Sequence, residues 1–338
     1  MNQIHTVPEC VHGPAWPAVI LQENGLSPLL LRGGGVYSVE IRSPECIRIG
    51  FIGAGKVGVS LGKYLKSRGR NIGGYYSRSP ESARWAAEFT ESVCYENIEE
   101  LIGSCDMILF TVPDDSIAPV WEEAKPYVSG RIIGHCSGIH SSNIFSDAGG
   151  TNGACSIHPL FAISSREHSW KELSSVLFTI EGDETSLQTV AELFRGVGNP
   201  VKIISAENKI KYHAAAALSS NYMTALFHMA ETLFSECGFG EAEARKQLYA
   251  LARGNLDHIL EQGCVDALTG PVERNDCVTV QRHIDAIGPE MREVYRKNAG
   301  YLIRVAEQKH PDRDYTQMKK ICAGSPDCPD IGRCAKTE

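Results

Sequence analysis

The sequence predicts a doubly wound, mostly parallel α/β domain followed by an all-α C-terminal domain. Strand-like and helix-like segments alternate from Ile47 to Ser205, which is the pattern of a parallel sheet covered by helices. A glycine-rich turn follows the first of these strands. After Ala206 the strand signals stop, and only the spacing typical of helices remains.

The strands of the first half are short apolar runs that end in glycine, proline or polar residues. We expect strands within 47–55, 71–79, 105–117, 131–138, 153–163, 175–183 and 200–205. The helices between them have apolar residues at helical spacing. These helices are expected at 56–69, 81–90 and 184–198.

The second half is predicted to contain four helices, at 207–237, 240–262, 275–286 and 288–308. The expected organisation is a poorly ordered leader (1–46), an α/β domain (47–205), a helical domain (206–310) and a loose tail (311–338). The leader is rich in proline and contains a run of three glycines. It is either a flexible arm or a consequence of where translation was taken to start.

Composition excludes several classes of partner. The chain has 338 residues, 43% hydrophobic and 22% charged, and a net charge of −8. This charge gives no basic field for nucleic acid or an anionic membrane. No apolar run approaches a membrane span, and the first residues lack the order of a signal peptide. We therefore expect a cytoplasmic protein that acts on a small molecule.

The twelve cysteines are scattered through a long chain, which favours reduced thiols over a disulfide framework. Cys322, Cys328 and Cys334 are regularly spaced near the C-terminus. Their intervals are wider than in a zinc knuckle, and no fourth ligand lies near them in sequence. No metal site is predicted.

The turn in "GFIGAGKVG" matches a phosphate-binding motif. Gly53, Gly55 and Gly58 form a G-x-G-x-x-G between a predicted strand and a predicted helix, and this context makes the motif specific. The glycines permit close approach of a pyrophosphate, and the helix N-terminus offers unpaired N–H groups. The pattern is typical of a Rossmann domain. The expected contact residues are Gly53, Ala54, Gly55, Lys56, Val57 and Gly58.

The end of the second strand favours NADP(H) over NAD(H). An NAD-binding domain usually places an acidic residue at this position, but the chain has Ser77, Arg78 and Ser79. A guanidinium and two hydroxyls would bind a 2′-phosphate. Alternatively, Arg78 is a solvated surface charge. Val112 and Pro113 end a later strand, and we expect them near the nicotinamide ribose.

The segment "ENKIKYHAAAALSSNYMTAL" combines small residues with two reactive side chains. Lys209 and His213 are one helical turn apart and share a face, with Asn221 two turns further on. The alanines and serines leave room for a ligand. A single histidine on a helix is often a packed core residue, but the adjacent lysine favours a catalytic role.

Three further polar residues are candidate substrate ligands. Ser137 and His158 follow apolar runs at expected carboxyl ends of strands, where α/β sheets bind ligands; the alternative is loop capping. Arg274 could bind a substrate carboxylate bidentately. No G-x-S-x-G or similar signature of a nucleophilic hydrolase is present.

The motifs "IGFIGAGKVGVSLGKYL", "HCSG", "HPLFAI", "KIKYHAAAALSSNY" and "TGPVERND" together resemble a Rossmann-like oxidoreductase family whose helical C-terminal domain was long catalogued as of unknown function. That family is related to ketopantoate reductase, pyrroline-5-carboxylate reductase and the 6-phosphogluconate dehydrogenase superfamily. The resemblance covers roughly residues 47–310. It implies a catalytic lysine at the start of the long helix, which Lys209 matches. His213 stands where relatives have Asn, and Glu273 is the nearest candidate for the late glutamate of ketopantoate reductases.

The resemblance implies an NADPH-dependent reductase of a small 2-oxo acid, with 2-dehydropantoate in pantothenate synthesis as the leading substrate. Lys209 would stabilise the developing alkoxide, and His213 would donate or relay the proton. Asn221, with His158 or Ser137, would orient the carbonyl. An imine reductase and a non-catalytic NADPH sensor are the alternatives. By analogy with the superfamily, we expect a homodimer.

Overall fold

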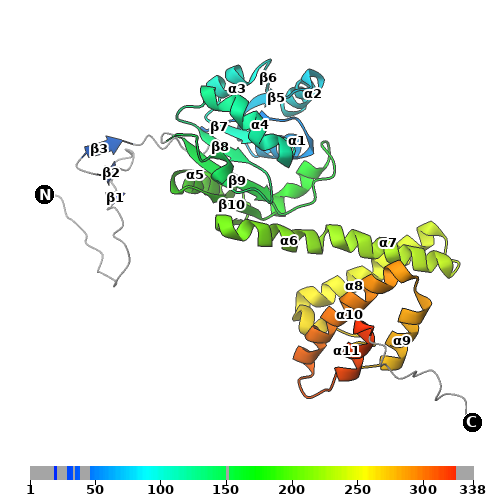
Figure 1. Ribbon diagram of the computed structural model, residues 1–338. Coiled ribbons are helices and arrows are strands. Elements are labelled where there is room, and N and C mark those ends of the chain that lie inside the picture. The colour runs from blue at the N-terminus through cyan, green and yellow to red at the C-terminus, as the bar shows by residue number, and fades with distance from the viewer. Residues whose placement is uncertain (1–18, 21–28, 33–34, 39–45, 150–151, 325–338) are drawn as a thin grey trace, which may run out of the picture. The chain divides into compact units, whose positions relative to one another are not determined.

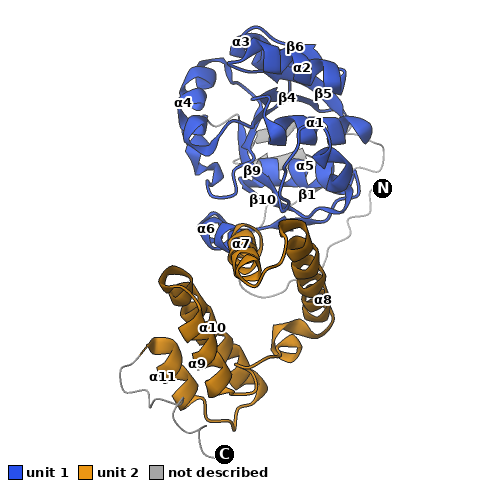
Figure 2. Cartoon of the chain, turned by 90° about the vertical axis from the view of Figure 1, so that its right-hand side faces the viewer, with its two compact units in different colours: residues 1–217 blue, residues 218–338 orange. Residues whose placement is uncertain are grey.

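The computed structural model describes residues 19–20, 29–32, 35–38, 46–149 and 152–324. The chain divides into two compact units, Met1–Ala217 and Leu218–Glu338 (Figure 2). The first unit therefore includes the first part of the helix expected at 207–237, up to Ala217. Each unit is described by itself.

The first unit is built on an eight-stranded sheet with the order β11-β10-β9-β8-β7-β4-β5-β6 (Figure 1). All neighbouring pairs are parallel except β9 and β10, which are antiparallel. The strands are β4 (Arg48–Ile52), β5 (Asn71–Tyr76), β6 (Val93–Cys94), β7 (Met107–Phe110), β8 (Ile132–His135), β9 (Gly153–Pro159), β10 (Phe178–Gly182) and β11 (Val201–Ile203). The predicted Rossmann class is confirmed.

Helices cover both faces of this sheet (Figure 1). They are α1 (Lys56–Ser67), α2 (Pro80–Thr90), α3 (Ile98–Ser104), α4 (Asp114–Ala124) and α5 (Glu184–Arg195). Because side chains alternate along a strand, β4 contributes Phe51 to one core and Ile52 to the other. Both faces of the sheet are therefore apolar and buried, which is typical of sheets with parallel strands.

The apolar runs do not reveal every element of the first unit. Helix α4 begins at Asp114, where the sequence suggested the end of a strand, and it contains Pro119. The strand expected over 105–117 ends at Phe110. Strand β6 has two residues, and α3 has seven, so neither provides enough periodic positions for detection.

The described part of the first unit also contains four 3-10 segments: η1 (Lys125–Tyr127), η2 (Ser142–Phe145), η3 (Ser169–Ser175) and η4 (Ala206–Asn208). Segment η4 leads into α6 (Lys209–Ser219). The single helix expected at 207–237 is interrupted, because Ser220 has non-helical angles (φ −123°, ψ −75°). The next helix begins at Asn221.

The second unit is helical, as expected. It consists of α7 (Asn221–Glu236), α8 (Glu241–Ala267), α9 (Cys277–Ala286), α10 (Pro289–Lys309) and α11 (Thr316–Ala323). Its core contains Val280, Ile284, Ile303 and Met318. Helix α11 lies in the segment for which a loose tail was expected, and that expectation is wrong for 316–323. Met318 and Ile321 are buried, and this burial stabilises a helix with few periodic positions.

The described parts of the leader form a three-stranded antiparallel sheet of β1 (Val19–Ile20), β2 (Leu29–Arg32) and β3 (Gly35–Ser38). The rest of the segment 1–45 lies outside the described residues, as do Cys328 and Cys334. Across the parts that the structure describes, no helix is long and apolar enough to cross a membrane.

Candidate active site

The glycine turn lies between β4 and α1 and closely approaches β7. Gly53 has a positive φ of 111°, and a Cβ there would lie 2.8 Å from the backbone carbon of Thr111. At Gly58 a Cβ would lie 2.3 Å from the Thr111 hydroxyl oxygen, which itself donates to the Gly53 carbonyl at 2.8 Å. Glycine is therefore required at both positions by conformation and by space.

Helix α1 presents an uncapped N-terminus at this turn. Gly55 is the N-cap residue, so it supplies no side-chain hydrogen bond, and it is exposed together with Lys56. Unpaired N–H groups at a helix N-terminus bind anions. The predicted contact residues Ala54 and Val57 belong to the same turn. The turn thus fits the pyrophosphate of a dinucleotide.

Ser77, Arg78 and Ser79 follow β5, as predicted. The Ser79 hydroxyl caps α2 by accepting from Ser82 N at 3.2 Å. Arg78 is exposed and Ser77 is half-buried. The Ser77 hydroxyl accepts from Ser79 N at 3.4 Å. Both hydroxyls keep a proton to donate, so the three residues offer two hydroxyls and a guanidinium at the end of the strand next to the glycine turn.

The carboxyl ends of β4, β7, β8 and β9 meet at one edge of the sheet, because these four strands are parallel. Val112 and Pro113 follow β7, and Pro113 caps α4. Ser137 follows β8, and His158 is the penultimate residue of β9. The fold thus brings the cofactor and substrate candidates of the first unit to the same edge.

The loop after β8 is held by a neutral histidine. The Ser137 N–H donates to His135 Nδ1 at 3.2 Å, so Nε2 carries the proton and donates to the Ser141 carbonyl at 3.2 Å. Burial lowers the pKa of His135 to about 4. The Ser137 hydroxyl accepts from the N–H groups of Ile139 and His140. Ser137 therefore shapes the loop, which was the alternative interpretation of this residue.

Lys209 is buried beneath this loop, with 2% of its surface exposed. Its Nζ donates to the Ser137 carbonyl at 3.0 Å and to the Ser156 hydroxyl. Burial lowers the pKa of Lys209 to about 8, against the opposing effect of the Glu181 carboxylate. Glu181 is itself buried and accepts from Ser142 N and Oγ at 2.8 and 2.6 Å. A nearby carboxylate compensates part of the cost of burying the ammonium.

Two histidines lie beside Lys209. The rings of His158 and His213 are 6.1 Å apart and nearly perpendicular, and both residues are half-buried. Gly138 lies against them, since a Cβ at this position would be 2.3 Å from His213 Cδ2 and 2.9 Å from His158 Nε2. Burial, reinforced by Lys209, lowers the pKa of His158 to about 4. His158 is therefore neutral at pH 7.

The structure thus brings Lys209, His213, His158 and Ser137 together within the first unit. Sequence reasoning missed Ser156, Gly138 and Tyr212, which contact this group. Gly138 lies in the motif "HCSG", and Ser156 lies in the strand expected at 153–163, so both segments were singled out without an assignment for these two residues. Nothing in the sequence singles out Tyr212.

Asn221 and Arg274 belong to the second unit and are exposed. Glu273 lies in that unit too, where its carboxylate contacts His310 and Arg313. Its backbone oxygen accepts from Arg313 and Tyr315 at 2.6 Å. Through these bonds Glu273 connects the loop before α9 to the residues after α10. Its contacts therefore indicate a structural role.

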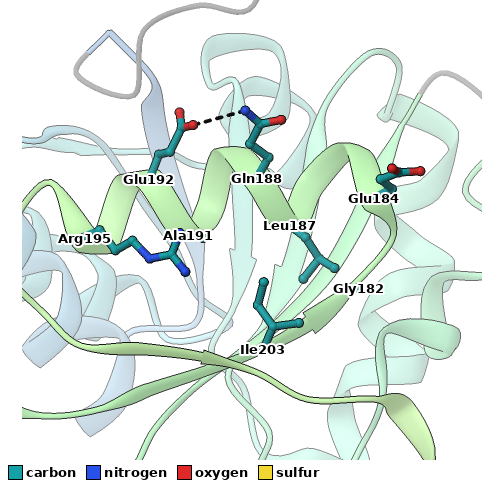
Figure 3. Close-up of a pocket in the computed structure, with 8 residues that line it drawn as sticks. All are labelled: Gly182, Glu184, Leu187, Gln188, Ala191, Glu192, Arg195 and Ile203. Atoms are coloured by element: carbon teal, nitrogen blue, oxygen red, sulfur yellow. Dashed lines mark hydrogen bonds between the residues drawn. The ribbon is translucent and has the colours of Figure 1, made fainter. Parts of the chain in front are cut away.

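One cavity of about 560 Å³ lies away from this group (Figure 3). It is lined by α5 and by Ile203 of β11, and Gln188 donates to Glu192 on its rim at 3.2 Å. None of the predicted site residues lines it.

No group of three potential metal ligands occurs in the described residues. Among the described residues, Cys94, Cys105, Cys136, Cys155, Cys237, Cys264 and Cys322 are free thiols. Cys322 is packed in the core of the second unit, which accounts for it without a ligand role.

Residues 48–133 match a family described as "NADP oxidoreductase coenzyme F420-dependent". Residues 176–302 match a domain of unknown function, DUF2520. The first match confirms the predicted cofactor class, NADP(H), and it supports an oxidoreductase. No curated protein sequence matches the chain significantly.

Solved structures share the fold. A protein described as an NADP oxidoreductase from Bacteroides fragilis is 21% identical, with a TM-score of 0.66, and the match covers 78% of this chain and all of the other. A protein from Thermotoga maritima is 26% identical, with a TM-score of 0.61 and coverage of 77% and 99%. Plasmodium falciparum pyrroline carboxylate reductase, solved with NADP bound, is 17% identical, with a TM-score of 0.53 and coverage of 82% and 99%.

Proposed function

We propose that the protein is an NADPH-dependent reductase of a small 2-oxo acid, with 2-dehydropantoate as the leading candidate. The observation that carries the proposal is the grouping of Lys209, His158 and His213 at the carboxyl ends of β8 and β9. The glycine turn ends β4 at the same edge of the sheet. Ligands of α/β sheets bind at this edge.

The residues of the first unit fit the cofactor. The Gly53–Gly58 turn would hold the pyrophosphate, while Ser77 and Arg78 would bind the 2′-phosphate. Val112 and Pro113 would lie beside the nicotinamide ribose. When bound, NADPH would supply a hydride to the substrate carbonyl.

The chain would stabilise the charge that forms on the carbonyl oxygen. The Lys209 ammonium is fixed by the Ser137 carbonyl and by Ser156, so its charge needs no rearrangement during the reaction. A preorganised charge of this kind contributes a few kcal/mol, about 10²- to 10³-fold in rate. His213 would donate or relay the proton, and His158 would orient the oxygen. For Asn221 and Arg274, a role in substrate binding stays a prediction from the sequence.

Two alternatives make different predictions. An imine reductase would transfer hydride to a C=N bond, whose reactive iminium form is cationic. The buried Lys209 charge favours a substrate that becomes negative, which is why the carbonyl is preferred. A non-catalytic sensor would bind NADPH without turnover.

An NADPH-oxidation screen with a panel of 2-oxo acids and cyclic imines distinguishes the three functions, with product identified by mass spectrometry. The proposal predicts a reduced 2-oxo acid in amounts that match the NADPH consumed. Reduction of cyclic imines alone would support the imine reductase. Tight NADPH binding without any turnover would support the sensor.

We also propose that the protein is a homodimer. Helices α7 and α8 expose several large apolar side chains, and exposed apolar surface is typical of an interface. The exposed fractions reach 61% for Tyr222, 45% for Leu226 and 86% for Leu260. Analytical ultracentrifugation should give the mass of a dimer, and Leu260→Asp should shift it toward the monomer. A monomeric wild-type protein at micromolar concentration would refute the proposal.

A further inference from the structure

One face of the β9–β10 pair carries polar side chains toward the start of α6. Glu181 of β10 lies opposite Ser156 of β9 in the antiparallel register. Opposite residues of such a pair project to the same face, with Cβ atoms about 5 Å apart. The Ser156 hydroxyl accepts from Lys209 Nζ. The Glu181 side chain therefore lies on the face that receives the Lys209 ammonium.

A second contact shows that α6 follows this face. His158 is two residues after Ser156 on β9, so its side chain projects to the same side. Its Nδ1 lies 2.8 Å from the hydroxyl oxygen of Tyr212, which is about one helical turn after Lys209. Successive turns of α6 thus contact successive residues of the polar face, and the first of these turns lies at the Glu181–Ser156 pair.

The Glu181 carboxylate is fixed in place. The residue is 5% exposed, and its two oxygens accept from Ser142 N at 2.8 Å and from Ser142 Oγ at 2.6 Å. Two accepting oxygens are typical of an ionised carboxylate. Ser142 ends the loop that Ser137 begins, and the Ser137 carbonyl accepts from Lys209 at 3.0 Å. The carboxylate and the ammonium therefore hold the two ends of one loop.

Most other titratable groups around Lys209 are neutral at pH 7. Among the described residues, the groups that face it are the carboxyls of Glu181 and Asp114, the thiols of Cys136 and Cys155, and the imidazoles of His135, His158 and His213. Burial lowers the pKa of His135 and His158 to about 4. Burial also raises the pKa of Cys136 to about 12 and that of Cys155 well above its usual value. The thiols therefore supply no negative charge to Lys209.

The two carboxylates differ in their surroundings. Asp114 is exposed at the start of α4, where water weakens its effect on a buried charge. Glu181 is buried on the face that Lys209 contacts. Burial lowers the pKa of Lys209 to about 8, and Glu181 is the largest opposing effect. Loss of this carboxylate would leave burial uncompensated, so the ammonium would lose its proton at a lower pH.

We propose that Glu181 is a positioning residue whose buried carboxylate keeps the Lys209 ammonium charged and in place. A neutral amine would not stabilise the alkoxide that forms on a substrate carbonyl. The part of the proposal that concerns the reaction rests on the proposed function, whereas the part that concerns the charge of Lys209 does not.

NMR of the full chain with ¹³C-labelled lysine tests the charge without a substrate. The ¹³Cε shift follows protonation of Nζ, and Lys209 is assigned by the signal that disappears in Lys209→Met. The wild-type signal should titrate near pH 8. In Glu181→Gln, which keeps an oxygen acceptor for Ser142 N, the midpoint should fall by about 1 pH unit. An unchanged midpoint in Glu181→Gln would overturn the proposal.

Two control variants separate the charge from other effects. Glu184→Gln removes an exposed carboxylate at the start of α5 and should leave the Lys209 midpoint unchanged. Ser142→Ala removes one hydrogen bond from Glu181 but keeps the carboxylate, so the midpoint should stay near that of the wild type. A fall in Ser142→Ala as large as in Glu181→Gln would contradict the proposal, because the loop rather than the charge would then control Lys209.

Stability tests the same pairing if Glu181→Gln folds poorly. Removal of one partner of a buried charge pair leaves the other uncompensated. In urea denaturation at pH 6, the double variant Glu181→Gln/Lys209→Met should therefore lose less stability than the sum of the losses in the two single variants. Additive losses would contradict the pairing.

Kinetics test the consequence for the reaction. A midpoint that is about 1 pH unit lower predicts that kcat/KM of Glu181→Gln is within about twofold of the wild type at pH 6 and pH 7, and about fivefold lower at pH 8. An equal loss at pH 6 and pH 8 would contradict a role through charge. If no 2-oxo acid is reduced, the NMR midpoint still decides the role of Glu181, so failure of the proposed function remains distinguishable.

Discussion

Lys209 Nζ donates to the backbone carbonyl of Ser137 at 3.0 Å, across 72 residues of sequence. This bond fixes the first turn of α6 to the loop after β8. The same ammonium also donates to the hydroxyl of Ser156 on β9, which pairs with His135 of β8. One buried charge thus connects the helix to the carboxyl ends of two strands, and it keeps that charge close to His158.

His135 should make the first unit sensitive to acid. Its pKa is about 4 in the folded protein and 6.5 in the reference state. Between these values the unfolded chain binds more protons, so the free energy of unfolding falls as pH falls from about 6.5 to 4. Urea denaturation at pH 7 and pH 5 should show this loss, and His135→Asn should reduce it. An equal loss in the variant and the wild type would contradict the assignment.

Gly138 should be essential for activity but not for folding. A methyl group there would meet the ends of the His213 and His158 side chains, which can rotate away. We expect Gly138→Ala to lower kcat by about tenfold or more, as displacement of catalytic groups does, with a small change in Tm. Gly103→Ala is a suitable control, because nothing lies within 4 Å of its added carbon. If Gly138→Ala kept full activity, the positions of His158 and His213 would not matter for catalysis.

Arg78 should determine the preference for NADPH. Removal of a guanidinium that binds the 2′-phosphate costs about 1.5–3 kcal/mol, which corresponds to roughly a 10- to 100-fold rise in KM for NADPH. Arg78→Ala should therefore raise the KM for NADPH and leave the KM for NADH unchanged. Steady-state kinetics with both cofactors measures this. Arg84→Ala, an exposed arginine on α2, should change neither. An equal effect on both cofactors would exclude phosphate recognition.

Glu273 should act on stability rather than on catalysis. Its carboxylate contacts His310 and Arg313 within the second unit, and the hydrogen bond from His310 is the main cause that lowers its pKa. Glu273→Ala should destabilise this unit by about 1–3 kcal/mol, because the His310 ring and the Arg313 guanidinium each lose a partner. Hydrogen exchange of α10 and α11 measures the effect, with the exposed Glu261→Ala as the control. A large loss of kcat in a stably folded Glu273→Ala variant would instead support a catalytic role for Glu273, which its resemblance to the late glutamate of ketopantoate reductases suggested.

Most of the sheet of the first unit could be predicted, because all of its strands except β6 and β11 have four or more residues, as in the apolar run Met107–Phe110. Elements with little periodicity could not. Helix α4 starts with two aspartates and contains Pro119, which are turn signals in a sequence. Helix α11 owes its stability to burial of Met318 and Ile321 by α9 and α10, and such tertiary contacts are not visible locally.

The candidate site could also be predicted only in part, because tertiary contacts are not visible in the local sequence. The pattern around Lys209 and His213 predicted their shared helix, and strand ends predicted Ser137 and His158. The sequence did not reveal that Lys209 is buried, because its partners Ser137 and Ser156 are 72 and 53 residues away. Tyr212 was missed for the same reason, since its partner His158 is 54 residues away.

The most direct test of the central claim is kcat/KM for NADPH-dependent reduction of the best 2-oxo acid, from pH 6 to pH 10, in wild type, Lys209→Met and Lys211→Met. Lys211 is the exposed neighbour on the same helix. Because the pKa of Lys209 is about 8, wild-type kcat/KM should fall as pH rises through this value, and so should that of Lys211→Met. Lys209→Met should be about 10²-fold slower or more at pH 7 and should lack this pH dependence. Equal rates for Lys209→Met and wild type would contradict the account.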